Sequence, residues 1–263
     1  MPLFLYSRRA VSFSALRTLE RSGIDLKLAI ITGASRGIGR AAAERFSEDG
    51  WELILNCRRH FELLRELSER LEKRTSCTII EGEITEELLS ERLGQAALSS
   101  MELLLINNAG ISLLSLTQDV GEEEYREILD TNLSAPFRLT RALIPYLLRA
   151  RQGRILNVSS VWGISGASME SVYSLTKGGI NAFTKALSKE LAPNHIPVNA
   201  AVFGAVDTDM NAWLSKEERE ELCREIPYGR MADTKEAAEF LRLLSMAPPY
   251  MTGQLIAFDG GWV

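Results

Sequence analysis

The sequence predicts a doubly wound α/β fold, in which a parallel sheet of about seven strands has helices on both faces. Seven short runs are almost continuously apolar, without polar alternation, as expected of strands that are buried on both faces of a parallel sheet. Amphipathic segments with helical spacing separate these runs. Such an alternation of strands and helices is typical of the doubly wound class.

The apolar runs follow one another from residue 28 to the end of the chain, without a linker or an internal repeat. They lie at residues 28–31, 52–56, 77–80, 103–107, 154–158, 197–202 and 255–258. Between the second and third runs, Phe61, Leu64, Leu67 and Leu71 recur at helical spacing and predict a helix over residues 61–73. We therefore expect one domain over residues 26–263. Its ligands should bind in the loops that follow the carboxyl ends of the strands.

The composition argues against several classes of protein. Hydrophobic residues make up 46% of the 263 residues and charged residues 25%, as in ordinary globular domains. No apolar run approaches the ~18 residues that cross a bilayer, so no membrane span is expected. The net charge of -5 gives no general attraction to nucleic acid, although local basic patches are compatible with it. The three cysteines form no CxxC pair, which predicts no metal site and fits a reducing, cytoplasmic compartment.

The first 25 residues differ in composition from the rest. Arg8, Arg9 and Arg17 precede any acidic residue, and serines are frequent, which is the composition of an organelle transit peptide. The alternatives are an N-terminal tail, a surface helix or an upstream start codon. We favour these alternatives over targeting, because one short biased segment is weak evidence. Residues 1–25 are therefore treated as an N-terminal extension outside the fold.

The first predicted strand leads directly into the segment TGASRGIG, with glycines at positions 33, 37 and 39, and a helical pattern follows. Glycine permits a tight turn and a close approach of the backbone to a pyrophosphate, which the N-terminus of the helix then binds. A glycine triplet alone is a weak signal, but the strand before it and the helix after it supply the required context. The segment predicts a Rossmann-like dinucleotide site rather than a turn without a ligand.

Arginines replace the acidic residue that an NAD-binding protein carries at the end of the second strand. The chain has Cys57, Arg58 and Arg59 at this point, and Arg36 lies in the glycine loop. Two guanidinium groups that converge there could hold a 2′-phosphate. The sequence therefore favours NADP over NAD, the alternative being a solvated basic loop before a helix.

In the segment SVYSLTKGG, Tyr173 and Lys177 lie four residues apart, on one side of a predicted helix. A phenol has an ordinary pKa of about 10, and a nearby ammonium group favours its anion. Tyr173 is therefore a candidate for acid-base catalysis. Gly178 and Gly179 each cost the helix about 1 kcal/mol relative to alanine. We expect them to permit close packing by a neighbouring element near a subunit interface.

Several motifs occur together in one order. These are TGASRGIG, NNAG at residues 107–110, Asn132 in DTNLSAPF, Ser160 in ILNVSSVWG, and the Tyr173/Lys177 pair. Taken alone, each has an ordinary explanation, such as a surface helix pair or a strand-end cap. The joint pattern over about residues 28–263 resembles the short-chain dehydrogenase/reductase family. Within this family the chain is most similar to 3-oxoacyl-[acyl-carrier-protein] reductases, through TGASRGIGRA, VDTDM and the C-terminal segment.

The resemblance implies roles for four catalytic residues. Tyr173 would donate the proton to the reduced carbonyl oxygen, and Ser160 would hydrogen-bond the same oxygen. Lys177 would also hold the nicotinamide ribose, and Asn132 would position a water that links Lys177 to solvent. The implied cofactor-binding residues are Gly33, Ser35, Arg36, Gly37, Ile38, Gly39, Arg58, Glu83, Asn108, Ala109, Gly110, Tyr173, Lys177, Gly204, Val206 and Thr208.

Two positions depart from the family pattern. Phe203 precedes Gly204 where relatives usually carry proline, which affects the loop beside the nicotinamide, and Glu83 replaces an aspartate near the adenine. A Ser-His-Asp hydrolase is the competing class of enzyme. The two histidines, His60 and His195, lie in polar loop contexts without a nucleophile-elbow motif, so we expect both to be solvated.

The expected activity is NADPH-dependent reduction of a 3-oxoacyl thioester in fatty-acid synthesis. The alternatives are oxidation or reduction of a sugar, a steroid or another small carbonyl compound, and a cofactor-binding regulator without turnover. Arg149, Arg151 and Arg154 could dock an acidic acyl carrier protein beside the mouth of the site, or simply complement a helix end. A second basic position of the family is Asn194 here. The resemblance also implies a homotetramer.

Overall fold

The computed structural model describes residues 26–93 and 98–263, and the predicted N-terminal extension lies outside the described residues. Seven strands form one parallel sheet in the order β3-β2-β1-β4-β5-β6-β7. The strands are β1 (Leu26–Thr32), β2 (Glu52–Cys57), β3 (Cys77–Glu81), β4 (Met101–Asn107), β5 (Gln152–Ser160), β6 (Val198–Phe203) and β7 (Leu255–Phe258). Each apolar run of the sequence is a strand, and the predicted fold class is confirmed.

Helices connect successive strands. They are α2 (Gly37–Glu48), α3 (Phe61–Leu71), α4 (Glu86–Leu93), α5 (Glu122–Leu129), α6 (Ala135–Leu147), α7 (Trp162–Ser165), α8 (Ser171–Leu191), α9 (Lys216–Glu225) and α10 (Thr234–Ser245). The predicted helix over residues 61–73 is confirmed as α3, which ends two residues earlier. None of the helices in the described part of the chain is both long and apolar enough to cross a membrane.

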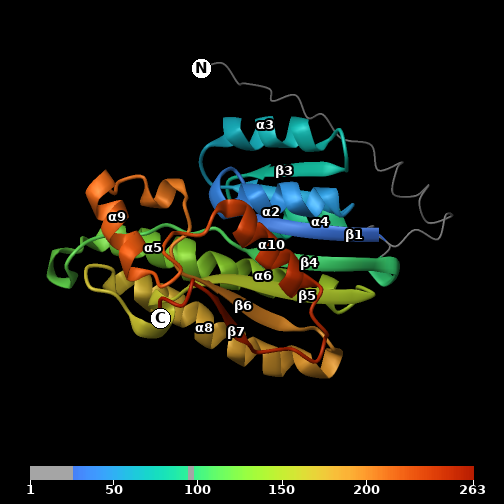
Figure 1. Ribbon diagram of the computed structural model, residues 1–263. Helices are drawn as coiled ribbons and strands as arrows, with labels where there is room; N and C mark the ends of the chain where they lie inside the picture. Colours follow the sequence, from blue (N-terminus) through green and yellow to red (C-terminus); the bar gives the residue numbers. More distant parts are fainter. Residues whose placement is uncertain (1–25, 94–97) are drawn as a thin grey trace, which may run out of the picture.

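The sheet has an apolar core on each face, because successive side chains of a strand point to opposite faces. Ile31 of β1 belongs to the core beneath α2, α3 and α10, whereas its neighbour Ile30 belongs to the core beneath α4, α6 and α8. Both side chains are fully buried. Figure 1 shows α2 and α10 side by side over the sheet, with α8 running along the opposite side.

The strand order reverses between β1 and β4. The chain builds outward from β1 through β2 to β3, then returns to add β4 on the other side of β1 and continues to β7. The loops that follow β1 and β4 therefore leave in opposite directions and open a crevice at the carboxyl edge of the sheet, where doubly wound proteins bind ligands.

Candidate active site

The loops after β1 and β4 are tied together at this crevice. Thr32, the last residue of β1, accepts hydrogen bonds at Oγ1 from the backbone N–H groups of Asn108 and Ala109, both at 3.0 Å. In return, Nδ2 of Asn108 donates to the carbonyl groups of Thr32 at 2.8 Å and Gly33 at 3.2 Å. The NNAG motif thus fixes the shape of the glycine loop, and the two motifs form one structural unit.

Two glycines of the loop are required by packing. A Cβ atom on Gly33, which has a φ of +66°, would lie 2.8 Å from the α-carbon of Ala109. A Cβ atom on Gly39 would overlap the carbonyl oxygen of Gly33. Gly39 therefore lies beneath the loop and outside the lining of the cavity above it, and its predicted contact with the cofactor stays a prediction.

A cleft of about 520 Å³ runs along this edge of the sheet. It is bounded by the loops after β1, β2, β4, β5 and β6 and by residues of α8 and α9. Most of the predicted site residues line it: Gly33, Ser35, Arg36, Gly37, Ile38, Arg58, Asn108, Ala109, Gly110, Ser160, Tyr173, Lys177, Gly204, Val206 and Thr208. Asn132, Glu83 and Gly39 do not. The structure thus brings the remainder together from segments far apart in the sequence.

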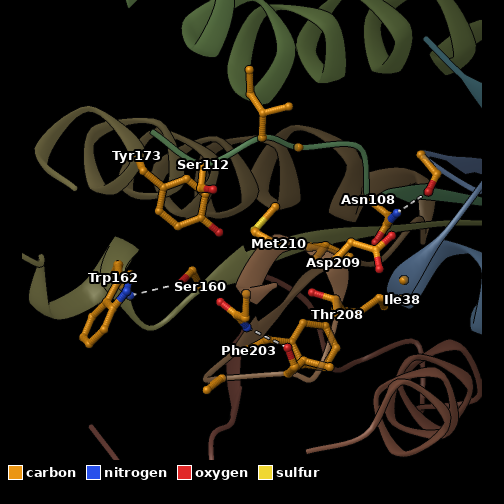
Figure 2. A pocket seen from close by; sticks show the side chains of 18 of the residues that line it. Ile38, Asn108, Ser112, Ser160, Trp162, Tyr173, Phe203, Thr208, Asp209 and Met210 are labelled. Carbon is orange, nitrogen blue, oxygen red and sulfur yellow. Dashed lines mark hydrogen bonds between the residues drawn. The ribbon is translucent and has the colours of Figure 1, made fainter. Parts of the chain in front are cut away.

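Tyr173 and Ser160 face each other across one end of the cleft. Figure 2 shows the Tyr173 hydroxyl pointing into the cavity on the side of Ser160, with Trp162 beside them. Ser160 is the last residue of β5, and its hydroxyl is close enough to the phenol of Tyr173 to lower the pKa of that group. Its Oγ also accepts the backbone N–H of Trp162 at 3.2 Å. The two hydroxyl groups are therefore placed to contact one oxygen atom of a bound carbonyl compound.

Lys177 lies one turn along α8 from Tyr173 and is only 4% exposed. Its ammonium group donates to the carbonyl of Val158 at 2.9 Å and lies 5.6 Å from the centre of the Tyr173 ring. Burial lowers the pKa of Lys177 to about 8, because the charged form is desolvated. At neutral pH the lysine is therefore mostly charged, but its charge is poorly stabilised.

The pKa of Tyr173 does not follow the sequence-based expectation. Burial raises it above the ordinary value, the neighbouring Ser160 hydroxyl lowers it by less, and the charge of Glu170 raises it further. The ammonium of Lys177 does not offset the burial of the phenol. In the protein by itself Tyr173 is thus a neutral phenol that holds its proton, which is the form a proton donor needs.

Asn132 lies in a π-helical turn, Asp130–Ser134, between α5 and α6. Its Oδ1 accepts the backbone N–H of Ile111 at 2.8 Å, and its Nδ2 donates to the carbonyl of Ile111 at 2.8 Å and to Oγ1 of Thr176 at 3.2 Å. The side chain of Asn132 therefore connects the loop after β4 to α8 by hydrogen bonds. This contact explains why Asn132 is outside the cleft, and its predicted role in holding a water stays a prediction.

Comparison with known proteins identifies the family. A family model described as short chain dehydrogenase matches residues 27–219. The chain belongs to the short-chain dehydrogenase family. This assignment is consistent with the glycine loop, the NNAG segment and the Ser160/Tyr173/Lys177 group, all within the matched range. Members of the family use NAD(P)(H) and act as oxidoreductases, so this short-chain dehydrogenase is an oxidoreductase.

Individual relatives cover nearly the whole domain. The chain is 37% identical over 239 residues to the uncharacterized oxidoreductase YmfI of Bacillus subtilis, covering 90% of this chain and 98% of the relative. It is 35% identical over 242 residues to the 3-oxoacyl-[acyl-carrier-protein] reductase FabG of Aquifex aeolicus, covering 89% and 96%. A crystal structure of YwfH, an NADPH-dependent reductase involved in bacilysin biosynthesis, has a TM-score of 0.81 at 21% identity and covers 90% and 98%. That likeness confirms the fold of this short-chain dehydrogenase.

The arginines predicted to bind a 2′-phosphate both line the cleft, but each has an acidic partner. Arg36 lies 3.4 Å from Asp209, and Arg58 lies 3.2 Å from Asp130 and donates to Oγ1 of Thr131 at 3.0 Å. These ion pairs are largely exposed, so they are weak and easily exchanged. Binding of a phosphate by both arginines stays a prediction.

Glu83 borders a separate cavity of about 80 Å³, which shares Arg58, Ala109 and Thr131 with the main cleft. Its carboxylate accepts a hydrogen bond from Nε of Arg138 at 3.1 Å. Glu83, which was predicted to contact an adenine ring, therefore does not line the main cleft, and its carboxylate is already paired with Arg138. The contact with adenine stays a prediction.

Phe203 takes part in an aromatic cluster. Its ring packs edge-on against Phe240 and Phe258, which stack on each other at 4.8 Å between ring centroids. The following residue, Gly204, has no room for a side chain, since a Cβ atom there would lie 2.8 Å from Asp259. Phe203, which stands where relatives usually carry proline, thus holds the loop after β6 by aromatic packing. A proline would hold it by its rigid ring.

The expectation that Arg149, Arg151 and Arg154 flank the mouth of the site is wrong for the single chain. They lie just before and within the first residues of β5, whereas Ser160 is its last residue. Eight steps of extended strand separate the ends of β5 by ~26 Å. Arg151 also pairs with Glu102 at 2.7 Å, and Arg154 is half-buried and donates to the carbonyl of Leu244 at 3.5 Å. The arginines therefore lie at the amino edge of the sheet, away from the cleft.

Both histidines are solvent-exposed, as predicted. His60 nevertheless borders the cleft at the start of α3, with a φ of +58°. Sequence reasoning missed three tryptophans that line the cleft, Trp162, Trp213 and Trp262. Trp162 follows Ser160 by two residues, which was a usable signal, whereas nothing in the local sequence places the penultimate residue Trp262 against it at 4.8 Å.

The glycines that follow Lys177 differ in their surroundings. A Cβ atom on Gly179 would lie 2.9 Å from the side chain of Leu133, so a neighbouring element does pack closely there, within the same chain. A Cβ atom on Gly178 would meet only the carbonyl oxygen of Gly163, at an ordinary 3.6 Å. The predicted close approach is confirmed for Gly179, and its location near a subunit interface stays a prediction.

This difference predicts opposite effects of alanine at the two positions. Gly178→Ala should raise the free energy of unfolding by about 0.5–1 kcal/mol, because alanine is the better helix former and fits. Gly179→Ala should lower it by about 1–2 kcal/mol, because Leu133 must move. Urea denaturation of both variants measures the difference. Equal effects would contradict the close packing of Leu133 against α8 at Gly179.

Proposed function

We propose that the protein reduces the ketone of a 3-oxoacyl thioester to the 3-hydroxyacyl product, with NADPH as the hydride donor. The observation that carries the proposal is the placement of the Ser160 and Tyr173 hydroxyls together at one end of a cleft whose other end is the glycine loop. A carbonyl oxygen between these hydroxyls would lie in the same cavity as a dinucleotide on the loop.

The residues of the cleft fit a dinucleotide phosphate. Gly33 and Gly37 have positive φ values, and the backbone of the loop leads into the N-terminus of α2, where unpaired N–H groups favour an anion. No acidic residue occupies the first turn of α2. Arg36 and Arg58 add positive charge at this end, which supports NADPH rather than NADH.

The protein's own residues would supply the proton transfer. Ser160 and Tyr173 would each donate a hydrogen bond to the carbonyl oxygen and hold it in place. As charge develops on this oxygen, the neutral phenol of Tyr173 would give it a proton, and the ammonium of Lys177 would stabilise the phenolate that remains. Bound NADPH would supply the hydride. Asn132 contributes indirectly, since it fixes the loop at Ile111 that borders the cleft.

The choice of a 3-oxoacyl thioester is supported by the relatives named as 3-oxoacyl-[acyl-carrier-protein] reductases at 33–35% identity. Docking of a carrier by Arg149, Arg151 and Arg154 would require them to serve the cleft of another subunit, since they lie at the far edge of their own sheet. A homotetramer would allow this. Exposed apolar side chains on the long helices, Phe137 and Leu175, support such an assembly.

A second candidate substrate is another small ketone. It is favoured by the acidic lining of the cleft contributed by Glu218, Glu221 and Glu225, which is unsuited to the acidic surface of a carrier protein. Such a substrate would use the same proton-donating group.

Oxidation of NADPH in the presence of ketones tests the proposed function. The purified protein should reduce an acetoacetyl thioester of N-acetylcysteamine, and the carrier-bound form more efficiently still, with at least about tenfold preference for NADPH over NADH. Sugar and steroid ketones serve as comparison substrates. A preference for one of these over both thioesters would remove the fatty-acid assignment while leaving the mechanism in place.

A further inference from the structure

Glu170 directly precedes α8, at the position that caps the helix, but its side chain forms no capping hydrogen bond. Carboxylates at this position usually accept a backbone N–H of the first turn and gain from the positive end of the helix. Glu170 is instead one of the residues that line the cleft, as are Tyr173 and Trp162. Its position therefore requires an explanation other than helix capping.

The backbone around Glu170 is held in an unusual conformation that directs this side chain. Met169 has a φ of +62°, in the left-handed region of backbone conformation that residues other than glycine rarely adopt. Its carbonyl accepts the backbone N–H of Ser115 at 2.7 Å, and Oγ of Ser171 lies 2.8 Å from Oγ1 of Thr117. The loop after β4 thus fixes the start of α8 at the rim of the cleft. Strained backbone that is fixed in this way commonly occurs at functional sites.

The carboxyl group of Glu170 is partly buried. Burial raises its pKa, and the neighbouring Trp162 side chain lowers it by less. Within residues 26–93 and 98–263, no lysine or arginine forms an ion pair with Glu170. The ammonium of Lys177, which lies deeper in the cleft, is directed to the carbonyl of Val158.

Apart from Lys177, the positive charges of the cleft lie at its other end. Arg36 belongs to the glycine loop, and Arg58 and Arg59 follow β2. None of them is placed to neutralise Glu170. A substrate at Ser160 and Tyr173 therefore meets a carboxylate at its side and no free cation.

We propose that Glu170 is a specificity-determining residue, which excludes substrates with an anionic group beside the ketone. The inference rests on the proposed function. Glu170 and Tyr173 are three residues apart at a helix start, so their Cβ atoms lie ~5–6 Å apart. A group two or three bonds from the reacting ketone is then within reach of the carboxylate.

This selection distinguishes a thioester from the corresponding free acid. A free 3-oxo acid carries a carboxylate two bonds from its ketone, and repulsion between two partly desolvated carboxylates is strong. In the thioester the same position is uncharged, because the sulfur of a pantetheine-like arm replaces the ionised oxygen of the carboxylate. Glu170 therefore favours esterified 3-oxo compounds and disfavours free keto acids.

The test compares S-acetoacetyl-N-acetylcysteamine with acetoacetate, as kcat/KM with NADPH, in the wild type and in Glu170→Gln. The expected result is that the ratio of the two kcat/KM values, thioester over acetoacetate, falls about tenfold or more in Glu170→Gln, because acetoacetate gains. Glu190→Gln, an exposed position near the other end of α8, should leave the ratio unchanged. A structural defect would lower both values together and leave their ratio unaltered.

The outcomes separate the two proposals. If the wild type reduces the thioester and Glu170→Gln keeps the wild-type ratio, the role of Glu170 is refuted while the proposed function stands. If the wild type reduces neither compound, the proposed function fails, and this inference fails with it. Glu170→Lys provides a second variant, in which acetoacetate should become the better substrate relative to Glu170→Gln.

Discussion

Tyr173→Phe is expected to lower kcat for ketone reduction by about 10²–10⁴-fold, the range that a positioned general acid contributes. The phenylalanine ring fills the same buried space, so the loss concerns the hydroxyl group alone. That hydroxyl points into the cleft beside Ser160 and holds its proton at neutral pH, because burial raises its pKa. Without it, the developing alkoxide receives no proton from the protein.

The binding of NADPH should change little in this variant. Fluorescence titration with NADPH and single-turnover reduction of the thioester therefore separate binding from chemistry. Tyr146→Phe, on α6 and remote from the cleft, is the matched control and should retain wild-type kcat. Turnover of Tyr173→Phe within a factor of about three of the wild type would refute the role of the phenol as proton donor.

The strands were predictable because their sequence signal is local and redundant. A strand buried on both faces must be apolar throughout, so β1 and β4 are visible as runs such as LAII and LLLIN without knowledge of their neighbours. The site residues were predictable for a related reason. Once the strands are assigned, the carboxyl-edge rule groups the segments that follow β1, β4, β5 and β6 at one edge of the sheet.

The errors concern what the local sequence does not contain. The packing role of Gly39 depends on the distance to Gly33, which only the folded loop defines. The ionisation of Tyr173 depends on desolvation, which a helical spacing does not reveal. Trp262 reaches Trp162 through tertiary packing at the end of the chain. The placement of Arg151 was a different kind of error, since a residue before a parallel strand must lie at the amino edge.

Lys177→Met is expected to have opposite effects on activity and stability. The ammonium that stabilises the phenolate of Tyr173 is lost, so kcat should fall by about 10²-fold or more. The free energy of unfolding at pH 7 should rise by about 1–3 kcal/mol, because methionine has a similar shape and no charge to desolvate. The unpaired carbonyl of Val158 offsets this gain by about 1 kcal/mol. The buried ammonium of Lys177 therefore lowers the free energy of unfolding while it provides the positive charge beside the phenol.

The dependence on pH tests this explanation. The pKa of Lys177 is about 8 in the folded protein, against an ordinary value of 10.5. Between these values the unfolded chain binds more protons than the folded one, so deprotonation of the folded lysine makes the wild type more stable as pH rises. The advantage of Lys177→Met in urea denaturation should accordingly shrink from pH 7.5 to about pH 10. Lys185→Met, at an exposed position of the same helix, should show no such change. The explanation would be contradicted if Lys177→Met were less stable than the wild type by the same amount at pH 7 and at pH 10. The surroundings of the ammonium would then fully offset the cost of its desolvation.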